Sequence, residues 1–427
     1  LRRQRQMCIR DRGDFHNTCP GTKQVQPASS DCRNDTMNLI KQLSTLQPNM
    51  VRWRHELHKY PETAYEETRT ADLVAKELEQ MGLEVHRGLA ETGVVGVLSA
   101  GRGNRAIGLR ADLDALNLQE LFYFDHRSLH DGKMHACGHD GHTAMLLGAA
   151  KHLSTDPGFD GTVFFIFQPA EEGGHGAKRM MDEGLFDAFP CESVFGMHNM
   201  PGFEAGTFAV RKGPLMASAD SAHVTVQGVG GHGAFPHLCR DPVLAAARIV
   251  DAWNTIVSRR VDPLDSAVIS VTQFQASAAI NVIPDSVTLG ATVRCLRSET
   301  RDLLENVLGE TAQGIARGCG VDAEYQYIRG DIATVNHDEP TDICSQVAAN
   351  LVGHERVLTN IDPLMGSEDF GWMLHERPGC YLFLGNGIGD TGGCMVHNPH
   401  YDFNDDILNI GAAYWVELAR TVLPTSR

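Results

Sequence analysis

A short stretch of the sequence carries a thiol and several imidazoles that could bind a metal ion. In His135-Ala136-Cys137-Gly138-His139-Asp140, the side chains of Cys137 and His139 stand two positions apart. Further candidate ligands come later in the chain: Glu171, Glu172, His198 and His397. Sulfur, nitrogen and carboxylate donors together suit Zn²⁺ and its first-row neighbours rather than Mg²⁺ or Ca²⁺. The residue types therefore favour a transition-metal site.

The expected strands place these groups at one edge of a sheet. Asp112 and Asp114 follow the apolar segment 106–109, Glu171 and Glu172 follow 162–167, and His198 follows 193–197. In open α/β sheets the ligand crevice lies beyond the carboxyl ends of the strands, so we expect these side chains to converge. The donors are too many for one tetrahedral ion, which favours two ions with a shared ligand. One of the adjacent glutamates could bind metal while the other acts as a general base.

Taken singly, each group has a plainer structural interpretation. A lone Cys-x-His pair usually binds nothing, and two adjacent glutamates after a strand more often form a solvated loop. His198 alone would be a hydrogen-bonded structural histidine, and Asp112 and Asp114 could cap the next segment. The metal-site hypothesis depends on four clusters that occupy equivalent positions in the expected fold.

Strands and helices alternate through most of the chain, which indicates an α/β layer fold. Apolar residues between 71 and 81 follow helical spacing, and Gly82 supplies a stop signal. Residues 162–167 form a continuous apolar run, which is typical of a central parallel strand. We therefore expect a mixed, mostly parallel sheet with helices on both faces.

The segment Gly101-Arg102-Gly103-Asn104 joins strands expected over 94–98 and 106–109. Together with Ala106 it formally matches a G-x-G-x-x-A dinucleotide-binding loop. Such a loop must open a helix, whereas here the chain runs directly into another strand. We predict a hairpin turn instead.

Between residues 218 and 329 the pattern changes to the order β-α-β-β-α-β, which is that of a ferredoxin-like unit. Asp241 as a cap and Pro242 at the first helical position mark the start of its first helix. We predict that 218–329 is an α+β domain inserted into an α/β domain formed by 37–217 and 330–427.

Residues 1–36 differ from the rest of the chain. Arginines crowd their beginning, and no apolar run typical of a secretory signal follows. We expect this segment to be a disordered or artefactual tail, with Met37 as the true start and with the loss of a targeting segment left open.

The overall composition narrows the class of protein. Lys and Arg number 37 and Asp and Glu 54, giving a net charge of −17, so a phosphate backbone would be repelled. We expect no nucleic-acid binding. No stretch of about 18 apolar residues is present, so we expect no membrane span. The 11 cysteines are scattered and odd in number, which favours reduced thiols in a cytoplasmic protein.

Several motifs resemble those of the two-metal amidohydrolases, the group of hippurate hydrolase, bacterial N-acyl-amino-acid aminoacylases and plant auxin–amino-acid conjugate hydrolases. The matching segments are 110–116, 134–142, 168–173, 230–234, 281–284, 366–370 and 397–403. The most specific are Cys137-Gly138-His139-Asp140-Gly141-His142 and the Glu171-Glu172 pair. The resemblance implies a zinc-exopeptidase-like catalytic domain with an inserted lid and dimerisation domain.

The same resemblance implies a role for each candidate residue. The metal ligands would be Cys137, His139, Glu172, His198 and His397. Glu171 would be the general base and acid, and Asp114 would orient a ligating imidazole. His232 would polarise the scissile carbonyl, with the active site of a partner subunit as a possible destination, and Asn281 and Arg294 would hold the substrate carboxylate. The implied cofactor is a pair of divalent ions, Zn, Mn, Co or Ni, and the implied assembly is a homodimer through the inserted domain.

The expected reaction is hydrolysis of the amide bond of a small N-acyl amino acid by a metal-activated water, with Glu171 as the base. Three alternatives remain open at this point: a dipeptidase or carboxypeptidase of the same superfamily, a thiol hydrolase that uses Cys137 as its nucleophile, and a catalytically silent metal-binding scaffold. The presence of both Glu171 and Glu172 argues against the scaffold, because a metal holder needs no spare base.

Overall fold

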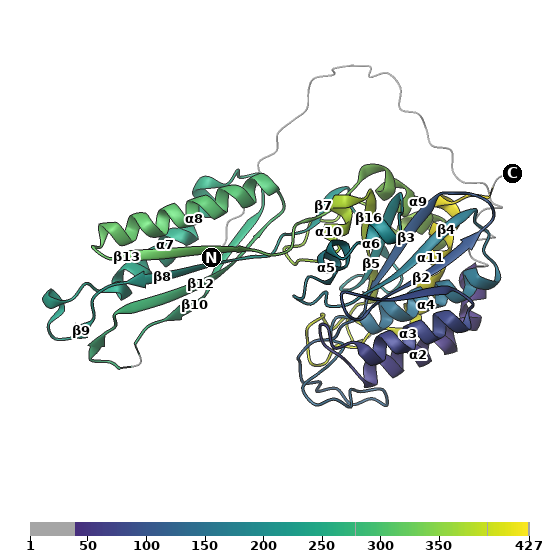
Figure 1. The fold of residues 1–427 in the computed structure, drawn as a ribbon, viewed down its shortest axis with the longest axis horizontal. Helices are drawn as coiled ribbons and strands as arrows, with labels where there is room; N and C mark the ends of the chain where they lie inside the picture. The colour runs from purple at the N-terminus through teal and green to yellow at the C-terminus, as the bar shows by residue number, and fades with distance from the viewer. Residues whose placement is uncertain (1–38, 278, 391, 426–427) are drawn as a thin grey trace, which may run out of the picture.

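The computed structural model describes residues 39–425 except 278 and 391. These residues form two bodies joined by a narrow connection, and the larger body holds both the first and the last helices (Figure 1). The tail predicted for residues 1–36 lies outside the described residues.

An eight-stranded sheet forms the centre of the larger body. In spatial order its strands are β1 (Glu84–Leu89), β2 (Gly93–Ala100), β4 (Gly161–Gln168), β3 (Ala106–Asp112), β5 (Ser193–Pro201), β16 (Gly379–Gly387), β6 (Phe208–Ala209) and β15 (Val357–Leu358). Neighbouring strands are parallel from β4 through β3 and β5 to β16, and again between β6 and β15. The other pairings are antiparallel. The expected mixed, mostly parallel sheet is confirmed.

Helices cover both faces of this sheet because its central strands are apolar on both sides. In β4, Val163 and Phe165 belong to one hydrophobic cluster, whereas Phe164 and Ile166 belong to another. The first face packs against α2 (Gln47–Lys59), α3 (Thr68–Gln80), α4 (His139–Thr155), α9 (Asp338–Val352) and α11 (Leu408–Val422). The second packs against α5 (Gly176–Asp182), α6 (Leu185–Ala188) and α10 (Gly371–Glu376). A strand buried on both faces explains the unbroken apolar run in the sequence.

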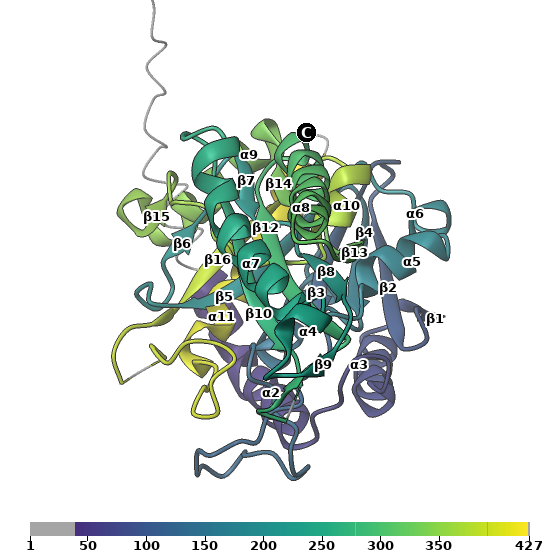
Figure 2. The same ribbon diagram turned by 90° about the vertical axis from the view of Figure 1, so that its left-hand side faces the viewer.

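The smaller body is an antiparallel four-stranded sheet with two helices on one face (Figures 1 and 2). Its elements are β8 (Asp220–Gln227), α7 (Pro242–Arg260), β10 (Ala267–Gln275), β12 (Ser286–Cys295), α8 (Ser298–Gly318) and β13 (Asp322–Arg329). The strand order β10-β12-β8-β13 is that of a ferredoxin-like unit. Alternate residues of β8, Ala222, Val224 and Val226, face the helices in a separate hydrophobic core. The α+β insertion is present as expected.

Local signals in the inserted body act as the sequence suggests. The side chain of Asp241 accepts a hydrogen bond of 2.8 Å from the backbone N–H of Val243, and Pro242 is the first residue of α7.

The domain boundaries at 218 and 329 stay a prediction, because the connecting segments contact both bodies. The N–H of Ser218 bonds to Cys295 of the smaller body, and Asp331 bonds to His175 of the larger one.

Short elements complete the fold. They are β7 (Gly213–Met216) paired with β14 (Thr334–Asn336), β9 (Gly231–His232) paired with β11 (Val282–Ile283), and the 3₁₀ turns Ser44–Leu46, Pro236–Leu238, His354–Arg356 and Asp405–Ile407. Among the described helices, none has both the length and the apolar character needed to cross a bilayer.

The prediction of a hairpin at Gly101–Asn104 is wrong. Strand β4 lies between β2 and β3, which therefore do not pair with each other. The turn is held instead by Asp160. Its carboxylate accepts hydrogen bonds from the N–H groups of Arg102 and Gly103. Turn chemistry was recognised correctly, but it does not determine which strands pair.

Candidate active site

Three parallel strands deliver carboxylates and an imidazole to one edge of the large sheet. Asp112 is the last residue of β3, and Glu171 and Glu172 follow β4. His198 lies within β5, beside Phe383 of β16, rather than after the end of its strand as expected. The convergence expected at the carboxyl edge is nevertheless present, because these strands run in the same direction.

Cys137 and His139 reach this edge from the start of α4. Between them Gly138 has φ +95°, and a Cβ at this position would lie 2.2 Å from Asn199 Oδ1 and 2.6 Å from Tyr401 Oη. Only glycine fits such a position without strain. The tight turn brings the thiol and the imidazole together from positions two residues apart in the chain.

The candidate ligands form two groups that share Cys137. Within each group the ligand atoms lie within 4.8 Å of one another: Cys137, His139 and His198 form one, and Cys137, Glu172 and His397 form the other. Cys137 Sγ is 3.3 Å from His198 Nε2, and His397 Nε2 is 3.0 Å from Glu172 Oε1. His397 adopts φ +61°, a strained conformation that the surrounding structure must hold in place.

Both imidazoles of the first group present one nitrogen toward the other ligands. His198 Nδ1 donates to the carbonyl oxygen of Asn199 at 2.5 Å, which leaves Nε2 for a ligand. His139 Nδ1 is 3.3 Å from Asp114 Oδ1. Both ring nitrogens of His139 are buried, and neither has a hydrogen-bond partner among the described residues. A buried imidazole without hydrogen-bond partners, with a carboxylate 3.3 Å from one of its nitrogens, fits a metal ligand.

The electrostatics of Cys137 fit a metal ligand better than a free nucleophile. Burial first, and then the carboxylates of Glu172 and Glu171, raise the pKa of the Cys137 thiol well above its ordinary value. A catalytic thiol needs a lowered pKa and an electropositive surrounding. A bound cation, by contrast, removes the thiol proton outright. The thiol-hydrolase alternative is therefore disfavoured.

Glu171 lies among other carboxylates. Its carboxylate forms a close group with those of Glu368 and Asp369. Burial, followed by the charges of Glu368 and Glu172, raises the pKa of Glu171 well above its ordinary value. A raised pKa suits a carboxylate that must both take up and release a proton near neutral pH.

Asp114 has a second contact that the sequence did not reveal. Its two carboxylate oxygens accept the backbone N–H groups of Glu171 and Glu172 at 3.0 and 2.9 Å. Asp114 therefore lies 3.3 Å from His139 Nδ1 and also holds the turn that carries both glutamates.

Two buried residues to which the sequence analysis assigned no role, Arg110 and His142, contact the carboxylate of Asp112. His142 Nδ1 is 2.6 Å from Asp112 Oδ1, and its Nε2 is 2.7 Å from Asn199 Oδ1. Arg110, wholly buried, donates to Asp112 at 2.6 Å and to Gln168 at 2.8 Å. A charged residue inside an apolar strand was the available signal, because arginine is rarely buried unless paired.

A cavity of about 720 Å³ lies between the candidate site and the base of the inserted body. Cys137, Glu171 and His397 line it from the larger body, and Arg294 of β12 lines it from the smaller one. Arg294 Nη1 donates to Ser367 Oγ at 2.9 Å. Arg294 is thus brought to the site, as expected.

His232 and Asn281 are not brought to the site. His232 is in β9, opposite Val282 of β11, and Asn281 directly precedes β11, where its carbonyl accepts the N–H of Gly233 at 2.8 Å. Both side chains are exposed. Figure 1 shows β9 at the end of the inserted body that is farthest from the large sheet.

The chain is similar to a known peptidase family and to several amide hydrolases. The family model of Peptidase family M20/M25/M40 matches residues 108–421. Hippurate hydrolase of Campylobacter jejuni is 43% identical over 383 residues, which are 90% of this chain and 99% of that protein. IAA-amino acid hydrolase ILR1-like 4 of Arabidopsis thaliana is 37% identical over 88% of this chain and 86% of its own length. N-acetylcysteine deacetylase of Bacillus subtilis is 35% identical over 88% and 97%.

A solved structure agrees with these relatives. The Bacillus subtilis YXEP protein, described as a dinuclear metal binding peptidase from the M20 family, has a TM-score of 0.77 at 31% identity. The match covers 90% of this chain and 100% of that protein. This protein therefore shares its overall fold with a member of the M20 family.

Proposed function

The chain belongs to peptidase family M20/M25/M40, and from this premise we propose that it hydrolyses the amide bond of N-acyl amino acids. The observation that carries the proposal is the position of Glu171 beside two groups of ligands that share Cys137. The relatives named for hippurate, IAA-amino acid and N-acetylcysteine hydrolysis support the substrate class.

Cys137, His139 and His198 would hold one divalent ion, and Cys137, Glu172 and His397 the second. The donor set suits Zn, Mn, Co or Ni. When bound, such a pair lowers the pKa of water toward 7 and polarises a carbonyl oxygen. The shared thiolate would keep both ions within reach of one substrate.

The chain's own residues would then move the proton. Glu171 takes a proton from the attacking water and returns it to the leaving amine, as one carboxylate can do in sequence. Asp114 holds the backbone of Glu171 and Glu172 throughout, through its contacts of 3.0 and 2.9 Å. Arg294, in the cavity wall, would pair with the substrate carboxylate, for which a guanidinium is geometrically suited.

We propose that His232 and Asn281 act on the active site of a partner subunit in a homodimer formed through the inserted domain. Their exposed position at the outer end of the smaller body supports this, because they are available to a second copy. His232 would stabilise the oxyanion there, where one lost donor costs about 10²–10³ in rate.

A mixed dimer tests this arrangement. We expect Glu171→Gln and His232→Ala homodimers to be nearly inactive, and their co-expressed mixture to recover up to about a quarter of wild-type activity. Half of randomly assorted dimers are mixed, and each has one site with both residues intact. A mixture that stays inactive, with mixed dimers shown by differently tagged copies, would mean that His232 serves its own chain.

Metal removal tests the reaction itself. We expect a chelator to abolish hydrolysis, and added Zn²⁺, Mn²⁺, Co²⁺ or Ni²⁺ to restore it. The assay should compare N-acetyl amino acids, N-benzoyl amino acids and dipeptides, reading metal requirement and substrate class together. Activity that survives chelation would favour a thiol mechanism at Cys137, and turnover of dipeptides alone would make the protein a peptidase. Bound metal without turnover would indicate a scaffold.

A cytoplasmic location is also a proposal. All cysteines in the described part of the chain are free: Cys137, Cys191, Cys239, Cys295, Cys319, Cys344, Cys380 and Cys394. Free thiols persist best in a reducing compartment, which supports the proposal.

A further inference from the structure

The loop that carries Glu171 and Glu172 is strained on both sides of this pair. Ala170 and His175 both adopt φ +55°, a left-handed conformation that non-glycine residues rarely take. Such a residue persists only when surrounding contacts hold it in place. The contacts at the two ends of this loop are therefore informative.

The first end is held from within the larger body. The N–H of Ala170 donates to the buried carboxylate of Glu67 at 2.9 Å, and Asp114 holds the N–H groups of Glu171 and Glu172. The N–H of Gly176 also bonds back to the carbonyl of Ala170 at 3.0 Å, which closes the loop. These contacts do not involve the inserted body.

The second end is held by the connection to the inserted body. His175 Nδ1 is 2.7 Å from Asp331 Oδ1, in the segment by which the chain returns after β13. Asp331 is only 6% exposed, and the same oxygen accepts Trp372 Nε1 at 3.1 Å. Its carbonyl accepts the N–H of Ala219 from the outgoing segment at 3.0 Å. Asp331 thus links both segments that connect the two bodies to the loop that carries Glu171 and Glu172.

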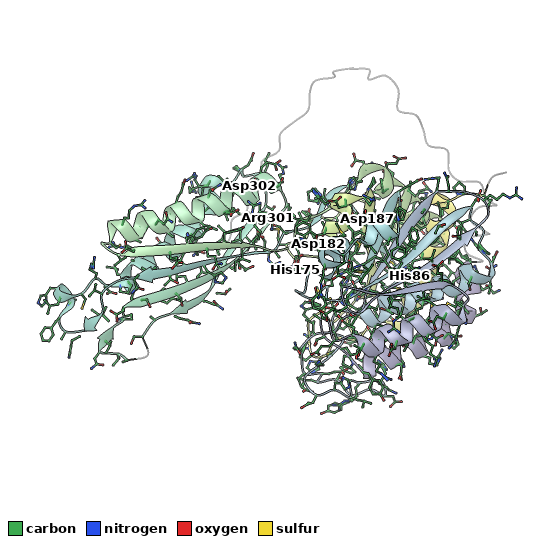
Figure 3. The ribbon with its side chains drawn as sticks, viewed as in Figure 1. His86, His175, Asp182, Asp187, Arg301 and Asp302 are labelled. Carbon is green, nitrogen blue, oxygen red and sulfur yellow. The ribbon has the colours of Figure 1, made fainter. Side chains whose placement is uncertain are left out.

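His175 lies where such a link is expected. Figure 3 shows it at the junction of the two bodies, and a Cβ on Gly330 would contact its ring at 3.6 Å. His175 belongs to none of the potential metal groups among the described residues. Its Nδ1 is already engaged by Asp331, which indicates a structural link rather than a ligand.

We propose that His175 is a positioning residue, which ties the loop bearing Glu171 and Glu172 to Asp331 so that the general base is held in its reacting position by the connection between the two bodies. The proposal rests on the proposed function, because it assigns His175 to the same reaction. Through the contact between Asp331 and His175, the position of the inserted body would influence the position of Glu171 without involving the substrate.

The test compares His175→Ala with His175→Asn. Alanine removes the donor, and since misplacement by 1 Å can cost about 10²-fold, we expect kcat to fall between about 10- and 100-fold. KM should stay within about twofold, because His175, although it lines the cavity, has its Nδ1 engaged by Asp331 and is assigned no contact with the substrate. Asparagine tolerates left-handed backbone and offers a donor near the Nδ1 position, so we expect kcat to recover to within about threefold of wild type.

Trp372→Phe is the matched control, since it removes the other hydrogen bond to the same oxygen of Asp331 without touching the loop. We expect its kcat to stay near the wild-type value. Hydrogen exchange of the peptide 168–177 gives a readout independent of turnover: it should accelerate in His175→Ala and remain slow in His175→Asn and Trp372→Phe.

The outcomes separate the two proposals. If the wild type hydrolyses no member of the acyl-amino-acid panel, the proposed function fails, and hydrogen exchange alone decides whether His175 holds the loop. If the wild type is active, three results would overturn the positioning role: unchanged kcat in His175→Ala, a rise in KM with unchanged kcat, or an asparagine variant as slow as the alanine variant.

Discussion

Glu171→Gln should lower kcat by about 10²–10⁴ while the bound metal and KM stay close to the wild-type values. The amide keeps the shape of the carboxylate but cannot accept the proton of the attacking water. The carboxylate of Glu171 lies within 4.8 Å of His139 and Glu172, but Glu171 belongs to neither of the two groups that share Cys137. We therefore expect both ions to stay bound in those two groups when Glu171 is replaced by glutamine. Steady-state kinetics and elemental analysis of the same preparation measure both quantities.

Two variants make this result specific. Glu172→Ala should lose metal as well as turnover, because Glu172 Oε1 faces His397 Nε2 at 3.0 Å. Glu66→Gln, which removes an exposed carboxylate paired with Lys133, should leave kcat unchanged. A Glu171→Gln enzyme with a near-normal kcat would remove Glu171 as the base, whatever its metal content.

The convergence of the ligands was predictable because it depends on a general rule. Apolar runs identify β4 and β5 as buried strands, and the carboxyl ends of parallel strands meet at one edge of the sheet. Glu172 and His198 follow from that rule, even though β5 extends three residues beyond His198 to Pro201. Errors in strand ends do not matter here, because neighbouring residues of adjacent strands stay close.

Features that depend on long-range contacts were not predictable in the same way. The turn at 101–104 indicated a reversal of the chain, but not that β4 would insert between β2 and β3. His175 looks like an ordinary loop residue until Asp331, 156 positions away, is seen beside it. The distance of His232 from the ligands depends on how the inserted body is set against the large sheet, which no local pattern encodes.

Arg110→Met should be among the most destabilising substitutions in the large body. The guanidinium is buried and contacts the carboxylates of Asp112 at 2.6 Å, Glu368 at 3.0 Å and Asp369 at 3.1 Å. Methionine fills a similar volume but leaves these buried carboxylates without their counter-charge. Removing one partner of a buried ion pair costs about 3–5 kcal/mol, and we expect a loss of that size in the free energy of unfolding.

Arg105→Met is the control because Arg105 lies just before the same strand but is exposed. Its ion pair with Glu192, at 2.9 Å, is solvent-accessible on both sides and should contribute no more than about 1 kcal/mol. Urea unfolding of both variants in the presence of a chelator measures the difference without the stabilisation that metal binding adds. Equal losses in the two variants would show that Asp112, Glu368 and Asp369 do not need Arg110 as their counter-charge. A selective loss in Arg110→Met would show that the buried guanidinium is a principal counter-charge of Asp112, Glu368 and Asp369.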